Sequence, residues 1–378
     1  MSLSRFRKQQ VGRIDAWLLL AILTLISFGL VMISSSSVVV ASQQFDNNYE
    51  FVIRQATHLG VGLIMLIICT IVDYRFWQRI APVLLIVIFV LLVATLIPGI
   101  GTQLQGARRW ISLGPIFFQT TELIKILSIL YFGAWLAARE GRMQSLSQSF
   151  LPFICMLGGI AILILVQPDA GTALVTTSTL ISMYFVAGAP LLHLALGALL
   201  GGSSFGLLIL AAPYRLQRLL VFLHPDQATL GAGYHINQAL LAVGAGGLWG
   251  LGFGQSKQKF LYLPEPHTDS IFAITIEELG FLRSLIVISV LLFVVVRGYN
   301  IARTVSDPFG RYVATGITSL ITFQAFVNIG AMLGLLPLTG VTLPFISYGG
   351  SSLIGLMASV GILLNISRNS SHGVRSIR

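Results

Sequence analysis

Apolar runs of about 20 residues recur along this chain and are separated by shorter polar segments. A run of that length crosses the hydrocarbon core of a bilayer as one helix. The pattern predicts ten spans, covering residues 16–41, 56–72, 79–99, 119–138, 150–167, 170–188, 191–212, 270–296, 312–335 and 342–366. The first span is too long for the apolar core of a signal peptide, and we interpret it as a retained membrane anchor.

Composition agrees with this pattern. Apolar residues make up 55% of the 378 residues and charged residues only 10%, whereas soluble domains carry about 25% charged residues. Mean hydropathy is +0.87, so an ordinary water-facing surface cannot cover the chain. The predicted fold class is an all-α polytopic membrane protein, with one transmembrane domain over residues 1–378.

The basic residues predict the orientation of the spans, because Lys and Arg accumulate in cytoplasmic loops. With a cytoplasmic N-terminus, 14 basic residues lie inside and 7 outside, and Lys125 and Arg283 fall within spans. Both termini, residues 1–15 and 367–378, are therefore predicted to be cytoplasmic. The net charge of +10 reflects this asymmetry and attraction to anionic lipid. No soluble basic domain exists that would bind nucleic acid.

Two expected outside segments are longer than the rest, residues 100–118 and 213–269. A loop of the second size without a core of its own is usually functional. Its stretch GAGGLWGLGFGQS follows no strand of a βαβ unit, which argues against a dinucleotide site and favours tight turns near the membrane surface. Cys69 and Cys155 each lie within a span, so they predict small buried residues and no disulfide framework.

Ionisable residues within spans are the first candidates for chemistry, because the membrane tolerates them at a cost. Glu122 and Lys125 lie three residues apart, on one face of the fourth span. They are either a self-neutralising structural pair or the lining of a polar cavity. Arg108 and Arg109, which enter just before them, favour the cavity.

Further acids stand near the outer ends of spans. Asp169 precedes the sixth span and can cap its first turn. Glu277 and Glu278 lie about two turns into the eighth span, and Arg283 follows closely enough to neutralise one of them, so structural pairing is the favoured interpretation.

Asp269 differs from these acids, because it ends the long outside loop at the mouth of the eighth span, beside His267 and Thr268. A helix cap and a catalytic carboxylate are both consistent with that position.

Four long stretches carry a resemblance to a known family. The chain resembles the SEDS family of peptidoglycan glycosyltransferases, which includes FtsW-like and RodA-like members, in GARRWISLGPIFFQTTELIK (106–125), QPDAGTAL (167–174), YRLQRLLVFLHPDQATLGAGYHINQALLAVGAGGLWGLGFGQSKQKFLYLPEPHTDSIFAITIEELGF (214–281) and FVNIGAMLGLLPLTGVTLPFISYGGSSL (326–353). The motifs favour the FtsW-like (division) branch over the RodA-like (elongation) branch.

The chain departs from the family pattern at three places. Thr120-Thr121 stands where the family usually has Pro-Ser, Ser270 where it usually has an aromatic residue, and Arg283 where it favours small residues. None of these changes removes an ionisable group, but Ser270 and Arg283 alter the setting of Asp269.

The resemblance implies that the chain polymerises lipid II, with Asp269 matching the family's essential carboxylate. A carboxylate that takes the proton of the acceptor sugar hydroxyl suits this reaction, since that hydroxyl is a poor nucleophile. The leaving pyrophosphate needs cations. The outer-side candidates are Arg108, Arg109, Lys125, Arg215 and Arg218. Glu122 and Asp169 match cavity positions that orient substrate or those bases.

The resemblance also implies partners and a location. A divalent cation, Mg²⁺ or Mn²⁺, would suit the pyrophosphate, and no other cofactor is implied. The expected partners are lipid II, a class B penicillin-binding protein acting as transpeptidase, other divisome or elongasome membrane proteins, and membrane lipid. The expected location is the bacterial cytoplasmic (inner) membrane, with the active site on the extracytoplasmic side. A lipid II flippase and a non-catalytic cell-wall scaffold remain as alternatives.

Overall fold

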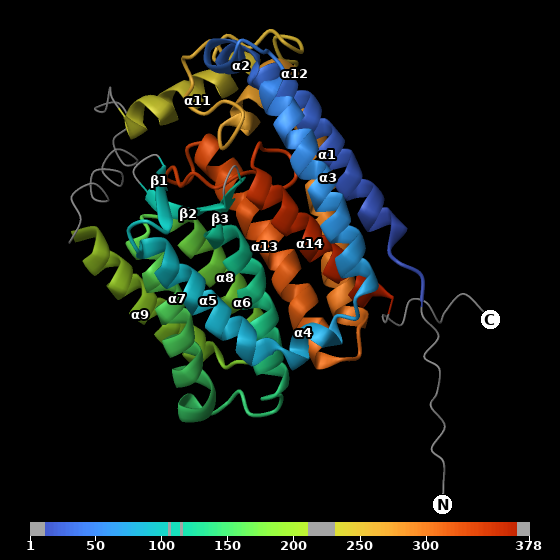
Figure 1. Cartoon of the computed structure of the whole chain (residues 1–378), viewed down its shortest axis with the longest axis vertical. Helices are drawn as coiled ribbons and strands as arrows, with labels where there is room; N and C mark the ends of the chain where they lie inside the picture. The colour runs from blue at the N-terminus through green and yellow to red at the C-terminus, as the bar shows by residue number, and fades with distance from the viewer. Residues whose placement is uncertain (1–11, 105–106, 114–115, 211–230, 369–378) are drawn as a thin grey trace, which may run out of the picture.

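The computed structural model describes residues 12–104, 107–113, 116–210 and 231–368, and within them the chain is a bundle of helices (Figure 1). Seven helical segments in these ranges are long and apolar enough to cross a membrane. They are α1 (Ala16–Ser36), α3 (Glu50–Ile71), α6 (Thr120–Ala137), η1 (Leu146–Phe150) continued by α7 (Leu151–Val166), α12 (Ile271–Thr304), α13 (Pro308–Met332) and α14 (Gly350–Ser367).

Three shorter apolar helices complete the bundle: α5 (Ala81–Leu96), α8 (Ala170–Val186) and α9 (Leu191–Leu210). Each predicted span therefore contains an apolar helix. Smaller helices lie at the ends of the bundle: α2 (Val38–Phe45), α4 (Arg75–Arg79) and α11 (Ala232–Gly246). The polytopic helical fold class is confirmed, and the count of ten crossings stays a prediction.

Several predicted boundaries were wrong, for local reasons. The first span, 16–41, divides at Ser37 into α1 and α2. Ser34 and Ser36 there donate to the carbonyls of Val31 and Ile33, and such back-bonding competes with the helix ladder. The tenth span was placed too early, because residues 338–349 contain no regular helix and α14 begins at Gly350.

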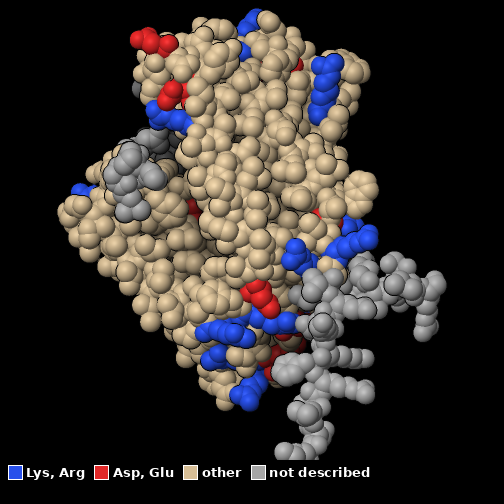
Figure 2. All heavy atoms as spheres, turned by 45° about the vertical axis from the view of Figure 1, so that its right-hand side comes forward, with Lys and Arg blue, Asp and Glu red and all other residues tan. Residues whose placement is uncertain are grey.

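The two ends of the described chain meet at one end of the bundle. The Gly12 amide donates to the Arg368 carbonyl at 3.1 Å. Beside it, Arg297 pairs with Asp15 at 2.6 Å. Both ends of the described chain therefore lie at the same end of the bundle. Figure 2 shows basic side chains towards both ends of this face, more of them in the lower part, with a broad uncharged surface between.

Helices differ in how far they are covered by the rest of the protein. Helices α6, α13 and α14 are mostly buried and form the centre of the bundle, whereas only 22% of the apolar window of α3, 33% of that of α7 and 28% of that of α12 is buried. The position of α7 corrects one expectation: Cys69 is buried as predicted, but Cys155 is exposed on α7. Periodicity alone does not distinguish a lipid-facing cysteine from a buried one.

Helix α12 is interrupted at Gly280, whose φ of 84° and ψ of 168° are not helical. The break receives the glycine-rich loop: Leu251 and Gly252 donate amides to the carbonyls of Glu277 and Glu278, each at 2.9 Å. A side chain at Gly280 would collide with the backbone of residues 248–250. The loop glycines 247, 250, 252 and 254 all have positive φ, so the tight turns predicted for this stretch are present.

Residues 100–118 were predicted as a loop and instead form most of a small antiparallel sheet. Its strands are β1 (Gly101–Leu104), β2 (Ala107–Leu113) and β3 (Ile116–Gln119), in the order β1-β2-β3. Trp110 is the register partner of Gln119, and α6 begins immediately after β3. The sheet therefore lies over the start of α6, next to α11 at one end of the bundle (Figure 1).

Candidate active site

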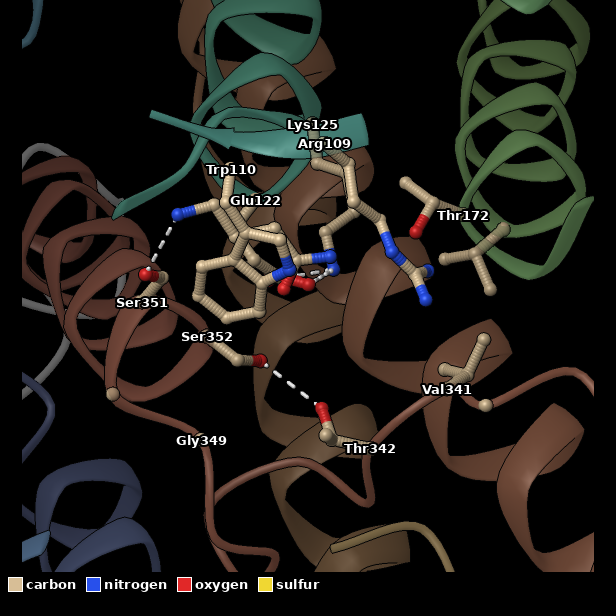
Figure 3. Close-up of a pocket in the computed structure, with 14 residues that line it drawn as sticks. Arg109, Trp110, Glu122, Lys125, Thr172, Val341, Thr342, Gly349, Ser351 and Ser352 are labelled. Carbon is tan, nitrogen blue, oxygen red and sulfur yellow. Dashed lines mark hydrogen bonds and ion pairs between the residues drawn. The ribbon is translucent and has the colours of Figure 1, made fainter. Parts of the chain in front are cut away.

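A polar cavity of about 50 Å³ lies beneath the sheet, which is room for a few water molecules. Strand β2, α6, α8, α14 and the non-helical segment before α14 all contribute to its lining (Figure 3). The lining residues are Arg109, Trp110, Gln119, Glu122, Lys125, Thr172, Val175, Gly340, Val341, Thr342, Gly349, Gly350, Ser351 and Ser352. The cavity predicted from Glu122 and Lys125 is therefore present.

The Glu122–Lys125 pair is both part of this lining and internally neutralised. The Lys125 ammonium lies 2.8 Å from the Glu122 carboxylate, and both side chains are almost fully buried. Lys125 also donates to Gln324 of α13 at 3.2 Å. Figure 3 shows the indole of Trp110 beside the pair. The two residues therefore neutralise each other and also line the cavity, which fits both interpretations that the sequence left open.

Asp169 caps α8 as predicted and has a second role. Its Oδ1 accepts from the Thr172 amide at 3.1 Å, while Oδ2 lies 3.2 Å from the Arg109 guanidinium. The Thr121 hydroxyl donates to the same oxygen at 3.4 Å, and Thr120 donates to the Arg109 carbonyl at 3.3 Å. The threonines that replace the usual Pro-Ser thus fix the arginine and its carboxylate partner.

The other predicted cations do not share this position. Arg108 is exposed, and because successive side chains of a strand point to opposite faces, it lies on the side of the sheet away from Arg109. Arg215 and Arg218 lie outside the described residues.

The non-helical segment before α14 is held by two amide side chains that the sequence interpretation overlooked. Gln324 donates to the Thr342 carbonyl at 3.1 Å. Asn328 donates to the Val341 carbonyl at 2.7 Å and to the Asp269 carbonyl at 2.8 Å. Irregular backbone at membrane depth requires such partners for its polar groups. Two polar amides four residues apart in an apolar span were the available signal.

Asp269 does not line the cavity, but helix α13 connects it to the cavity wall. Since Gln324 and Asn328 are four residues apart, they lie on one helix face about 6 Å apart along the axis. Asn328 holds Asp269 on one turn, and Gln324 contacts Lys125 on the next. The structure thus brings the predicted base and the buried cation to neighbouring turns of one helix.

The surroundings of Asp269 change its acidity. Thr268 lies between two carboxylates, with its hydroxyl 3.2 Å from Asp269 Oδ1 and 3.1 Å from Glu265 Oε2. Burial and the negative charge of Glu265 together raise the pKa of Asp269 to about 7. Ser270, not Asp269, occupies the N-cap position of α12, and its side chain forms no capping hydrogen bond there.

Two histidines flank this carboxylate in neutral form. Burial lowers the pKa of His267 and of His235 to about 4 in each case. His267 packs against Phe51, with ring centroids 4.2 Å apart. His235 of α11 lies 2.6 Å from the Ser270 hydroxyl, which donates to the Pro264 carbonyl. Ser270, in place of the usual aromatic residue, therefore links the outer helix α11 to the start of α12.

The predicted pairing of Glu277 or Glu278 with Arg283 was wrong. Glu278 pairs with Lys259 of the long loop at 3.0 Å, and both are buried. Glu277 accepts from the Ser256 hydroxyl and from the Lys257 amide. Arg283 is exposed and donates to the Trp249 carbonyl. Because α12 is interrupted at Gly280, the side chain of Arg283 points in a different direction from those of Glu277 and Glu278.

The predicted divalent cation finds no complete set of ligands in the described part of the chain. No three His, Cys, Asp or Glu side chains gather there as a metal site. Mg²⁺ is commonly held by one or two carboxylates together with substrate phosphates, so the divalent cation stays a prediction.

Known proteins resemble this chain along almost its whole length. Stage V sporulation protein E of Bacillus subtilis (strain 168) is 42% identical over 356 residues, which cover 94% of this chain and 97% of that protein. A probable peptidoglycan glycosyltransferase FtsW of Saccharophagus degradans is 41% identical over 372 residues, which cover 97% and 96%.

Solved structures give the same result. RodA, the rod shape determining protein of Thermus thermophilus, superposes with a TM-score of 0.70 at 28% identity, covering 95% of this chain and 98% of that one. A chain from a peptidoglycan synthase complex that coordinates polymerization and crosslinking reaches 0.80, also at 28% identity and with the same coverage. The family profile FtsW/RodA/SpoVE, described as cell cycle protein, matches residues 16–372, and the chain belongs to this family.

Proposed function

We propose that this protein is a membrane peptidoglycan glycosyltransferase that polymerises lipid II, with Asp269 as the general base. The observation that carries the proposal is the placement of Asp269: a carboxylate with a pKa near neutrality, held by α13 one turn from the buried Lys125 of the polar cavity. A general base works best when its pKa lies near the operating pH. Relatives named as peptidoglycan glycosyltransferases support the same substrate class.

The proposed reaction transfers the donor sugar chain to an acceptor hydroxyl. The 4-hydroxyl oxygen of the acceptor attacks the anomeric carbon of the donor as the bond to the lipid pyrophosphate breaks. Asp269 takes the hydroxyl proton, and the electron pair of the broken bond leaves with the pyrophosphate. Arg109 is the partly exposed cation of the cavity lining and can meet the negative charge that develops on that leaving group.

The cavity must widen before it can hold a lipid-linked disaccharide, since its present volume admits only a few waters. Residues 338–349 are non-helical and border the cavity at Gly340, Val341, Thr342 and Gly349. Together with the sheet, this segment is the part of the wall that can move without unwinding a helix.

The proposed location is the bacterial cytoplasmic membrane, with the sheet, α11 and Asp269 on the extracytoplasmic side. The basic asymmetry of the loops supports that orientation. Similarity to a chain of a peptidoglycan synthase complex supports a crosslinking partner, which we propose is a class B penicillin-binding protein. The division branch is favoured, because several of the similar proteins are named FtsW.

Polymerisation by purified protein separates this function from its rivals. Protein in detergent, given lipid II, should form glycan strands that a gel resolves, whereas a flippase or a scaffold should form none. Asp269→Asn removes the proton acceptor while keeping the shape of the side chain, and should make no polymer. Normal polymerisation by that variant would overturn the assignment of the base.

The Asn variant should also fold normally. A raised pKa means that the ionised carboxylate costs folding free energy once the pH exceeds its unfolded-state value. The neutral amide avoids that cost, so the thermal midpoint of Asp269→Asn at pH 8 should equal or exceed that of the parent protein.

A further inference from the structure

A second hollow lies at the end of the bundle opposite the sheet and has no part in the proposed chemistry. It is an open hollow of about 470 Å³, larger than the cavity beneath the sheet, and is lined by Ala138, Arg139, Arg142, Gln148 and Pro152. These residues belong to the end of α6, the connection that follows it, and the start of η1 and α7. Two of the five lining side chains are therefore guanidinium groups.

Arg139 is held in a fixed position at the hollow. Its guanidinium carbon lies 4.3 Å from the ring centroid of Trp135, one turn earlier on α6. Stacking of this kind engages the flat face of the guanidinium group and its charge. The N–H donors lie in the plane of the group, so they stay directed outward, in the fork that fits a phosphate.

The positive charge of the hollow is not neutralised by neighbouring acids. Glu140, which stands between the two arginines in sequence, pairs with Arg311 of α13 at 3.6 Å. Neither Arg139 nor Arg142 forms an ion pair with any residue that the structure describes. Arg142 is exposed and Arg139 partly exposed, so both guanidinium groups are accessible to an anionic ligand that enters the hollow.

Apolar side chains border the same place on the surface of the bundle. Leu146 is 48% exposed and Leu151 57% exposed, and both belong to the candidate span Leu146–Val166. Cys155, one turn beyond Leu151, is exposed as well. A ligand that satisfies both surfaces has an anionic head for the arginines and an acyl chain for the exposed face of α7.

We propose that this hollow binds the phosphate headgroup of an anionic phospholipid from the surrounding leaflet. Basic pockets at the ends of membrane helices bind such headgroups, and each basic residue near an anionic surface contributes about fivefold to the association. The acyl chains of the lipid lie along Leu151 and Cys155. The site is separate from the cavity beneath the sheet, and its occupancy does not depend on the substrate proposed above.

Native mass spectrometry of the detergent-purified protein tests this proposal. The protein is mixed with phosphatidylglycerol or with phosphatidylcholine of the same acyl chains, and retained lipid is counted. Parent protein should retain phosphatidylglycerol preferentially. The variant R139Q/R142Q should retain on the order of tenfold less, while R303Q, which removes an exposed basic residue elsewhere, should match the parent.

Two further arms keep the test decisive. R142Q alone leaves the stack of Arg139 on Trp135 intact, so its reduced retention cannot come from a disturbed α6. Inorganic phosphate at millimolar concentration should not displace the lipid; displacement would show that the hollow binds a soluble anion and would overturn the lipid assignment. Equal retention of both lipids, or no loss in R142Q and R139Q/R142Q, would also overturn it.

Discussion

The side-chain amide of Asn328 joins the proposed base to the wall of the cavity. One of its N–H groups donates to the main-chain oxygen of Asp269 at 2.8 Å and the other to that of Val341 at 2.7 Å. Four residues earlier on α13, Gln324 accepts from the Lys125 ammonium through its side-chain oxygen and donates to the Thr342 carbonyl through its amide nitrogen. Helix α13 is therefore the element that sets the distance between base and cavity.

Asn328→Ala should lower the kcat of polymerisation by at least tenfold with little change in KM for lipid II. The variant leaves two carbonyls without their donor, at about 1–3 kcal/mol for each buried group, and lets Asp269 move relative to the cavity. Enzymes lose activity steeply when a reacting group is misplaced by about 1 Å. Rates should be measured per folded molecule, below the thermal midpoint of the variant.

Asn365→Ala is the matched control. Asn365 is also a buried amide: it donates to the Thr70 carbonyl and accepts from the Tyr74 main-chain amide. It lies at the end of α14 that is remote from Asp269. It should lose stability to a similar extent and keep its kcat. If Asn328→Ala kept the kcat of the parent protein, that result would contradict the role of Asn328 in positioning Asp269.

The rate of polymerisation should rise with pH through about 7. Asp269 must be ionised to take a proton, and burial together with Glu265 raises its pKa to about 7, so only about a tenth of the enzyme is active at pH 6. His235 and His267 have pKa values near 4 and stay neutral over this range. Glu265→Gln removes a negative neighbour, lowers the pKa of Asp269, and should make the enzyme more active than the parent at pH 6. An unchanged rising limb in that variant would argue against the assignment.

Glu278→Gln should destabilise the protein by about 3–5 kcal/mol, because it leaves the buried Lys259 without its carboxylate. Lys259→Met should do the same by stranding Glu278. Arg283→Ala should change stability by less than about 0.5 kcal/mol, since Arg283 is exposed. Thermal unfolding in detergent compares the three variants. If Arg283→Ala proved as damaging as Glu278→Gln, the pairing seen in the structure would be incorrect.

Hydropathy located the helices because a membrane span is defined by composition over about 20 residues. It could not locate strands β1, β2 and β3, since each is only 4 to 7 residues long and far shorter than the window over which a span is recognised. The divided first span and the late start of α14 depended on serine hydroxyls and on a non-helical segment that overall apolarity conceals.

The site was predicted as far as ionisable residues could indicate it. Glu122, Lys125, Arg109 and Asp169 do converge, because charges within spans need partners. Lys259 was missed as the partner of Glu278, since a loop of intervening residues and the break at Gly280 bring them together. Asn328 was missed for a related reason: its two acceptors lie in other segments, and sequence spacing carries no signal for them.

The orientation of the bundle can be tested with reporter fusions. Fusions after Arg142 and Arg303 should behave as cytoplasmic, and fusions after Lys257 or near Asp226 as external; Asp226 lies outside the described residues. The reason is the excess of basic residues on the first side, 14 against 7. An external signal at Arg303 would contradict the proposed topology and, with it, the extracytoplasmic position of Asp269.

The Glu122–Lys125 pair allows its structural and functional roles to be separated. Lys125→Met alone should lower stability by about 3–5 kcal/mol, because the buried Glu122 loses its partner. The double variant Glu122→Gln/Lys125→Met removes both charges, and replacing a buried pair by uncharged groups of similar size is often neutral for stability. The double variant should therefore recover most of the thermal midpoint.

Polymerisation should not recover with stability. The cavity needs a cation near the developing charge of the pyrophosphate and a carboxylate that holds Lys125 against Gln324, so the double variant should make less than about a hundredth of the parent's polymer. Gel analysis of lipid II products, with protein matched by folded fraction, measures this. A stable and active double variant would show that the pair serves only to fill the bundle. A stable and inactive one would place it in the machinery of transfer, because folding could no longer account for the loss.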